Sequence, residues 1–238
     1  AYYSFDGCNA RDLTGNGSDG ELFGDIGCWC GVDNDGLLFD GAGDYLEFPG
    51  PVNRYFTTSD FTVSFYFRSD GYSVFPMSML SKREACDEEH LLDIHLDLRH
   101  QEIGTELRQS EHRYFRGLAP EYGGAGWWHY VLVREGRYAY TYINGKLAKK
   151  SVLCSGVDIT NEAVLSFGNS PCIRGGRMRP FQGVLDELRV YDQALTEEQV
   201  LELYNKYPVE NAETDCLSFL DKKMSPQTEE EGKSLYLC

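Results

Sequence analysis

Residues 61–68 read Phe61-Thr62-Val63-Ser64-Phe65-Tyr66-Phe67-Arg68. The odd-numbered positions of this stretch are all apolar, and the even-numbered positions carry mostly polar side chains. Successive side chains of a β-strand point to opposite faces of its sheet. The period of two therefore predicts a strand in a sheet that buries one face in a core.

The same alternation recurs in shorter runs along the chain. These runs are residues 37–39, 44–48, 91–99, 128–134, 138–143, 163–167 and 183–191, and clusters of Gly, Asn and Asp separate them. Many short strands with turn residues between them predict a β-sandwich. The pair Asn144-Gly145 predicts a hairpin, because both residue types tolerate the positive φ of a type I′ turn.

One short helix is predicted after the last of these runs. Thr196 can cap its N-terminus, Gln199 completes a capping box three residues later, and Leu195 can pack against Val200. Pro208 ends the helix. From residue 209 onward the sequence is acidic and rich in turn residues, which predicts an appendage held by its cysteines.

Charge and length exclude several classes of protein. The 238 residues carry a formal net charge of -16, from 38 acidic and 22 basic side chains. Nucleic-acid phosphates and anionic membrane surfaces repel such a chain, so neither nucleic-acid binding nor membrane insertion is expected. No apolar run approaches the roughly 18 residues that cross a bilayer. The start of the sequence also lacks a basic and apolar leader, from which we expect a mature secreted protein.

Cysteine usage supports the same location. The eight cysteines are Cys8, Cys28, Cys30, Cys86, Cys154, Cys172, Cys216 and Cys238. No CxxC pair is present to suggest zinc or redox chemistry, so disulfides formed in an oxidising compartment are expected. The sequence does not choose among the pairings, although the placement of Cys216 and Cys238 around the acidic tail suggests a local loop.

Four segments, taken in order, resemble a known family. They are residues 3–7 with 12–17, residues 38–41 with 44–46, residues 128–131 with 142–146, and residues 181–191 with 194–196. Their sequences and spacing over residues 1–207 resemble the laminin-G-like jelly rolls of the concanavalin-A-like superfamily. The fourth segment, which begins at Phe181 and contains Asp186, is the most specific.

This resemblance implies an all-β fold, a two-sheet antiparallel jelly-roll sandwich with the short C-terminal helix. The domain would span residues 1–208, and residues 209–238 would form the acidic tail. The family implies an extracellular module that binds carbohydrate or protein, often with one structural calcium. It also contains appendages of glycosidases and oligomeric relatives, so the fold alone does not assign a ligand.

Three residues are predicted to hold the calcium ion: Asp6, Asn16 and Asp186. By strand parity, Asp186 shares an apolar face with Val184 and Leu188, and a buried carboxylate needs a cation or hydrogen-bond donors. The alternative is that Asp186 accepts backbone N–H bonds. Asn16 also begins the N-glycosylation triplet Asn16-Gly17-Ser18, and an asparagine that carries a glycan cannot bind the metal.

A polar strand face is the predicted ligand-binding site. Asp93, His95, Asp97 and Arg99 project on one side of residues 91–99, opposite three aliphatic side chains. Such a face can do general acid/base chemistry, but a solvated polar face is the simpler interpretation, and no catalytic residues are assigned. Trp127, next to a core Trp128, is a further candidate contact.

The sequence therefore predicts an extracellular recognition or adhesion module for a glycan or an extracellular protein. One alternative is a structural subunit of an extracellular assembly, in which the terminal cysteines cross-link chains. A second alternative is a polysaccharide-active enzyme that uses Asp93, His95 and Asp97 on the concave sheet.

Overall fold

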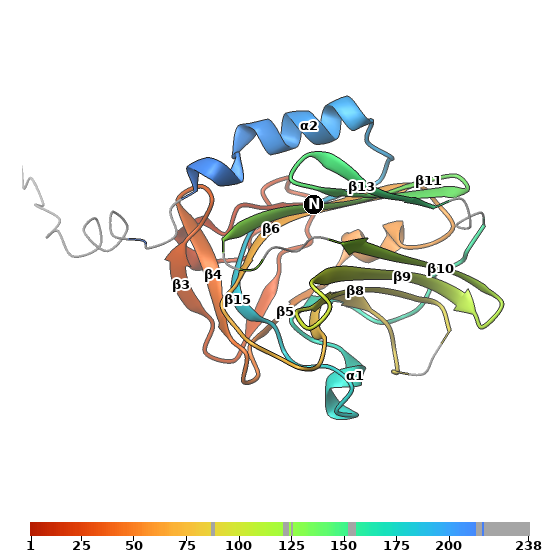
Figure 1. Ribbon diagram of the computed structural model, residues 1–238, viewed down its shortest axis with the longest axis horizontal. Helices are drawn as coiled ribbons and strands as arrows, with labels where there is room; N and C mark the ends of the chain where they lie inside the picture. Colours follow the sequence, from red (N-terminus) through yellow and green to blue (C-terminus); the bar gives the residue numbers. More distant parts are fainter. Residues whose placement is uncertain (87–88, 121–123, 125, 152–155, 213–215, 217–238) are drawn as a thin grey trace, which may run out of the picture.

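Two antiparallel sheets pack face to face across an aromatic and aliphatic core (Figure 1). The computed structural model describes residues 1–86, 89–120, 124, 126–151, 156–212 and 216. The predicted jelly-roll sandwich with a short C-terminal helix is confirmed. The core lies between the sheets and includes Phe65, whose ring centroid lies 5.2 Å from that of Tyr130 and 5.7 Å from that of Phe167.

Sheet A forms one layer. In spatial order it contains β13 (Lys146–Ser151), β12 (Tyr138–Ile143), β11 (Trp127–Glu135), β6 (Phe61–Ser69), β15 (Gln182–Tyr191), β4 (Asp35–Asp40) and β3 (Gly27–Cys30), and β1 (Tyr2–Tyr3) also pairs with β15.

Sheet B forms the other layer. Its order is β10 (Arg113–Pro120), β9 (Glu102–Ser110), β8 (Leu91–Asp97), β7 (Met77–Lys82), β14 (Leu165–Phe167), β5 (Tyr45–Phe48) and β2 (Glu21–Phe23). The helices are α1 (Pro171–Arg174) and α2 (Glu197–Lys206), and the 3-10 helices are η1 (Asp6–Cys8), η2 (Pro51–Tyr55) and η3 (Val209–Asn211).

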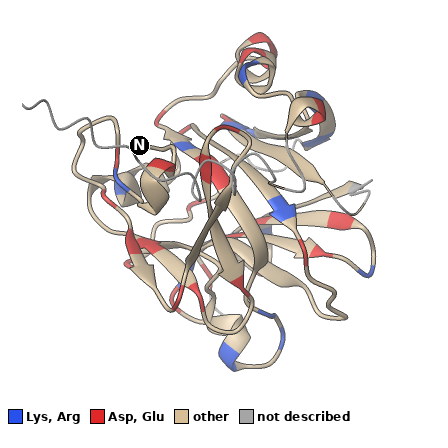
Figure 2. Ribbon diagram, turned by 90° about the vertical axis from the view of Figure 1, so that its left-hand side faces the viewer, with Lys and Arg blue, Asp and Glu red and all other residues tan. Residues whose placement is uncertain are grey.

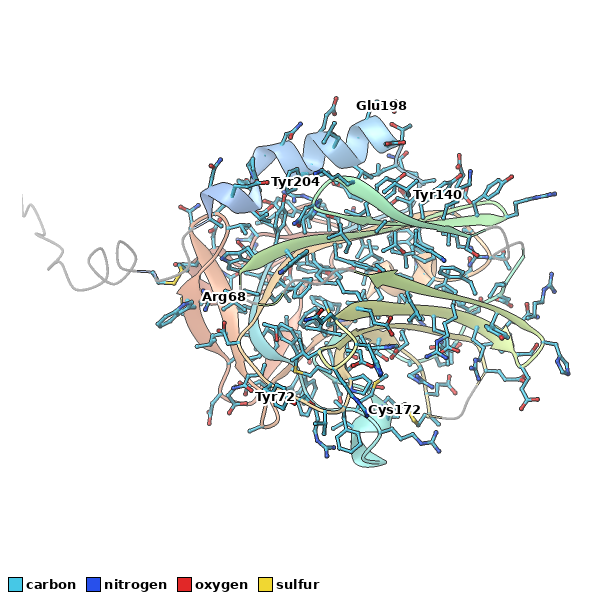
Figure 3. The ribbon with its side chains drawn as sticks, viewed as in Figure 1. Arg68, Tyr72, Tyr140, Cys172, Glu198 and Tyr204 are labelled. Carbon is cyan, nitrogen blue, oxygen red and sulfur yellow. A yellow bond between two sulfur atoms is a disulfide. The ribbon has the colours of Figure 1, made fainter. Side chains whose placement is uncertain are left out.

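Helix α2 covers the outer face of sheet A (Figure 1). The predicted capping box is present: the Thr196 side chain accepts from the Gln199 N–H, and the Gln199 side chain accepts from the Thr196 N–H. Leu195 and Val200 pack together with Val131 of β11. Figure 3 shows Tyr204 on the side of α2 that faces the sheet and Glu198 on the opposite side.

This cover changes the environment of β6. The alternation predicted one buried face, whereas all of β6 is buried. The Tyr66 hydroxyl, on the predicted solvent side, donates to the carbonyls of Leu203 and Tyr204 in α2. The prediction of a one-sided strand was wrong here because a helix distant in sequence occupies the second face.

The Asn144-Gly145 hairpin is confirmed, with φ values of 48° and 73° between β12 and β13. Strands β2, β3, β7, β9 and β10 were not predicted. In β7 every residue is buried, and a bulge between Ser78 and Leu80 interrupts the alternation of apolar and polar side chains. Strand β9 mixes core residues such as Leu107 with Gly104 and several charges, which obscures its period.

Three disulfides join distant parts of the described chain: Cys8–Cys28, Cys30–Cys216 and Cys86–Cys172. The suggested local loop between Cys216 and Cys238 was wrong, because Cys216 pairs with Cys30 on β3. Cys154 and Cys238 lie outside the described residues.

The first residues after the predicted domain boundary pack onto the domain. Val209 and Ala212 contact a cluster on the outer face of sheet A that contains Tyr66, Trp127 and Val184. Residues 217–238 of the predicted tail lie outside the described part. No helix among the described residues is long and apolar enough to cross a membrane.

Candidate functional site

The outward face of β8 and β9 in sheet B gathers polar side chains from both strands. Leu92, Ile94 and Leu96 of β8 point into the core and are fully buried, which turns the alternate residues outward. The resulting "polar face" consists of Asp93, His95 and Asp97 from β8 and of Glu102 and Glu106 from β9. In the ribbon of Figure 2, acidic residues are marked in red on several strands and loops of the same molecule.

His95 is held in one orientation. Its Nδ1 lies 2.8 Å from Oδ2 of Asp93, a carboxylate that is only 1% exposed. Arg83 places Nη1 3.7 Å from the other Asp93 oxygen. Gly104 lies opposite His95 on β9, and a Cβ there would come within 2.2 Å of the imidazole Nε2. The His95 ring therefore lies across Gly104, and any side chain at position 104 would displace the ring.

Two other polar-face carboxylates, Glu106 and Asp97, have a close guanidinium or imidazole partner. Arg108 donates through Nε to Glu106 at 2.8 Å. Asp97 accepts the backbone N–H groups of Arg99 and His100, and its Oδ2 lies 2.7 Å from Nδ1 of His100. These hydrogen bonds outweigh partial burial and lower the pKa of Asp97, so this carboxylate is ionised at neutral pH.

Two predicted contact residues lie elsewhere. Strand β8 ends at Asp97, so Arg99 is in the following turn and does not continue the row of side chains on the polar face. Trp127 was predicted to be available at the surface, but it is 4% exposed and packs with Tyr66 and Val184 on the outer face of sheet A. The expected exposure of Trp127 was wrong because the segment after α2 covers it.

Asp186 is fully buried, but not on the predicted face. A bulge inserts one extra residue into β15 opposite β6, with Glu187 at a φ of 54°. Consequently Asp186 faces outward with Val184, while Leu188 and Val190 point into the core. The parity prediction was wrong because the bulge reverses the phase of the strand.

Backbone donors surround the Asp186 carboxylate. Its Oδ2 accepts N–H bonds from Val32 at 2.8 Å and Asp33 at 3.3 Å, and its Oδ1 accepts from Glu187 at 2.8 Å. Burial, followed by the charge of Glu187, raises the pKa of Asp186 well above its usual range. This arrangement is the hydrogen-bonded alternative that the sequence left open.

The predicted calcium ligands do not form one convergent set in the described structure. Asp6 is exposed, and its Oδ1 accepts from the Asp35 N–H at 3.4 Å, so Asp6 and Asp186 both contact the loop of residues 32–35. Asn16 instead lines a pocket beside Arg189, whose positive charge disfavours a cation. The arrangement does not fit a calcium ion held by all three side chains.

Two pairs of buried polar side chains were missed by sequence reasoning. Glu187 and Arg189 form an ion pair on β15, and the Tyr2 hydroxyl donates to Glu187 at 2.8 Å. Ser64 Oγ lies 2.8 Å from Nε2 of His129, both fully buried. Only the alternating charges of Glu187 and Arg189 were visible in the sequence, whereas the Ser64–His129 contact depends on the pairing of β6 with β11.

A pocket of about 360 Å³ lies at the end of β15, away from the polar face. It is lined by Ala1, Tyr2, Thr14, Asn16, Tyr55, Arg189, Val190, Tyr191 and Asp192. The Arg189 guanidinium lies 4.1 Å from the centre of the Tyr2 ring. The pocket therefore combines aromatic surfaces with a few polar groups, as small-ligand sites do.

Comparison with known proteins places the chain among jelly-roll domains. A model of the Concanavalin A-like lectin/glucanases superfamily matches residues 40–201. Domain 4 of AbnA, a GH43 extracellular arabinanase from Geobacillus stearothermophilus, solved with arabinotriose, is similar with a TM-score of 0.66 and 20% identity; the match covers 86% of this chain and 97% of that domain. A search of curated proteins found no match.

Toxin binding domains have the same fold. The binding domain of Paraclostridial Mosquitocidal Protein 1 matches with a TM-score of 0.66 and 18% identity, over 83% of this chain and 49% of that one. The binding domain of botulinum neurotoxin DC, in complex with rat synaptotagmin II, matches with a TM-score of 0.67 and 12% identity, over 87% of this chain and 51% of that one. This chain thus spans about half the length of these toxin domains.

Proposed function

The chain belongs to the Concanavalin A-like lectin/glucanases superfamily, and we propose that it is an extracellular recognition module whose ligand binds the polar face. The observation that carries this proposal is the fixed imidazole of His95, held by the buried Asp93 and lying across Gly104. A preoriented donor or acceptor loses little conformational freedom on binding. The disulfide-bonded fold fits the proposed extracellular location.

The charges of the polar face favour a neutral, hydroxyl-rich glycan as the ligand. Arg83 and Arg108 offset Asp93 and Glu106, whereas Asp97 and Glu102 add negative charge that repels sulfated or carboxylated glycans. Carboxylates accept hydrogen bonds from hydroxyl groups, and an imidazole can donate a hydrogen bond to a hydroxyl or accept one from it. The arabinotriose complex of the AbnA domain supports a glycan, and the synaptotagmin II complex of the toxin domain supports a protein as the other ligand class.

Substituting Gly104 by Ala is expected to weaken ligand binding at least tenfold, because the new Cβ displaces the His95 ring. His95→Ala should have a similar effect. The ligand is first found on a glycan and matrix-protein array, with and without calcium, and affinities are then measured by calorimetry. His112→Ala, an exposed histidine of the β9–β10 turn, is the matched control and should bind as the wild type does.

Circular dichroism and thermal melting separate loss of binding from loss of folding in these variants. Unchanged affinity in folded Gly104→Ala and His95→Ala would refute the polar face as the site. No binding to either ligand class on the array would contradict the recognition function itself. Light scattering of the same samples tests the alternative of a self-associating structural subunit, which requires stable oligomers.

A second candidate is an enzyme acting on a polysaccharide, and the Asp93–His95 contact is the observation that favours it. A buried carboxylate that orients an imidazole can support proton transfer. Incubation with alginate, laminarin and related glycans, followed by detection of reducing ends or unsaturated products, tests this candidate. Absence of products, or equal activity in His95→Ala, would exclude His95 from such a role.

The structural calcium remains a separate part of the proposal. What supports an ion is the approach of Asp6 and Asp186 to the same loop, residues 32–35. An ion that binds only the folded chain raises the melting temperature. Scanning calorimetry in millimolar calcium and in excess chelator is expected to give a higher Tm with calcium for the wild type and little difference for Asp186→Asn. Equal Tm values for the wild type in both buffers would contradict the ion.

A further inference from the structure

The triplet Asn16-Gly17-Ser18 has no part in the polar face. It is the one Asn-x-Ser/Thr triplet without proline in the sequence. Asn16 is exposed, in a turn flanked by Gly15 and Gly17 with φ values of 74° and 77°. A Cβ built on either glycine meets no atom within 4 Å, so the turn projects into open surroundings.

Unlike several other asparagine amides in the described chain, the amide of Asn16 is not held by hydrogen bonds to the fold. Asn9, Asn53 and Asn161 donate through Nδ2 to backbone carbonyls, and Asn144 accepts a backbone N–H through its side-chain oxygen. Among the described residues, no hydrogen bond involves the Asn16 side chain. The fold therefore leaves the Nδ2 atom of Asn16 available for a covalent attachment.

The third residue of the triplet is built into the fold. Ser18 is 1% exposed, its Oγ accepts from the Val52 N–H at 2.9 Å, and its carbonyl accepts from the Tyr3 hydroxyl at 2.7 Å. An enzyme that recognises the serine hydroxyl reaches it only in the unfolded chain. The attached group, by contrast, would remain outside the folded domain because Asn16 is exposed.

The pocket described above lies directly beside this attachment point. Asn16 lines it together with Tyr2, Tyr55 and Tyr191, and tyrosine rings offer apolar surfaces to a sugar while their hydroxyls offer hydrogen bonds. None of the residues that line the pocket belongs to β8 or β9. A glycan in this pocket therefore leaves the polar face uncovered.

We propose that Asn16 carries an N-linked oligosaccharide, added before folding, whose first sugar lies in the adjacent pocket. In the transfer, Nδ2 attacks the anomeric carbon of a lipid-pyrophosphate-linked oligosaccharide. The C1–Nδ2 bond forms, the C1–O bond breaks, the lipid pyrophosphate leaves, and the amide proton passes to a base of the transferase. Because Nδ2 then bears the glycan, Asn16 is not a calcium ligand.

Attachment is tested on the full chain secreted from cultured mammalian cells. Peptide mapping after enzymatic cleavage of Asn-linked glycans in ¹⁸O-water is expected to show Asn16 converted to labelled aspartate. Asn16→Gln should lose the glycan, whereas Asn9→Gln, at an exposed asparagine outside any triplet, should keep it. Unmodified Asn16 in the secreted wild type would overturn the proposal, whether or not the variants fold.

The timing is tested with unglycosylated protein and microsomal oligosaccharyltransferase. The reduced, unfolded chain is expected to accept a glycan, and the folded disulfide-bonded chain is expected to remain unmodified. Equal transfer to both forms would refute addition before folding.

The position of the first sugar is tested by trimming the glycan. Protein trimmed to one sugar should melt at a higher temperature than protein that was never glycosylated and keeps an unmodified Asn16, and Tyr55→Ala should abolish this difference. Equal melting temperatures in the wild type would show that the sugar does not occupy the pocket.

Discussion

Acidification from pH 7 to pH 4 is expected to destabilise the wild type by about 3 kcal/mol relative to a variant that lacks the His129 imidazole. Burial, followed by the charge of Arg189, lowers the pKa of His129 from 6.5 to about 3. Its ring stacks on those of Tyr66 and of Tyr204 in α2, with distances between ring centroids of 4.2 and 6.0 Å. Its Nδ1 has no hydrogen-bond partner in the described structure. The folded protein therefore holds a neutral imidazole.

The sign follows from proton uptake. Below pH 6.5 the unfolded chain binds a proton at His129 and the folded chain does not. As the pH decreases from 6.5, the free energy of unfolding therefore decreases, until the pH reaches the folded pKa of about 3. Above pH 6.5 His129 is neutral in both states, and the full free energy of unfolding is retained. The buried Asp186 and Glu187, whose pKa values are raised, act in the opposite direction, so the His129 contribution is measured as a difference.

The comparison variant is His129→Phe combined with Ser64→Ala, because removing both partners of a buried hydrogen bond costs less than removing one. Guanidinium unfolding at several pH values between 7 and 4 provides the free energies. His112→Gln should follow the wild type, since that histidine is exposed. Parallel pH profiles for the wild type and the double variant would show that His129 does not titrate as expected.

Removing the Cys30–Cys216 disulfide, as Cys30→Ala with Cys216→Ala, is expected to lower the free energy of unfolding by up to about 5 kcal/mol. The bond closes a loop with a sequence separation of 186, and cross-links that close longer loops restrict the unfolded chain more strongly. Cys216 is fully buried, and the preceding residues Val209 and Ala212 cover the outer face of sheet A. Loss of the bond should also loosen this cover.

The matched control is removal of Cys8–Cys28, which has a sequence separation of 20 and an expected effect of about 3 kcal/mol. Chemical denaturation under non-reducing conditions compares the two variants. Hydrogen exchange should rise at the end of α2 and in residues 207–212 only when Cys30–Cys216 is absent. A smaller loss for the long-range pair than for the short one would contradict the expectation.

Local sequence patterns were sufficient where the determinants lie close together in the chain. The alternation in residues 61–68 predicted β6, Thr196 and Gln199 predicted the start of α2, and Asn144-Gly145 predicted the turn between β12 and β13. Each of these signals depends on the backbone preferences of a few neighbouring residues. The polar character of the β8 face could also be predicted, because successive strand side chains alternate between faces.

Only the tertiary structure decided which of these residues are accessible and what they contact. Trp127 and Tyr66 are buried because α2 and residues 207–212 return to sheet A, and Asp186 changes face because a bulge forms where β15 pairs with β6. His95 lies flat because Gly104 is opposite it on the neighbouring strand. The sequence by itself determined the fold class, helix α2 and those strands whose apolar and polar side chains alternate. Long-range pairing determined accessibility and contacts, since no local period encodes which distant segments cover a face or which strands become neighbours.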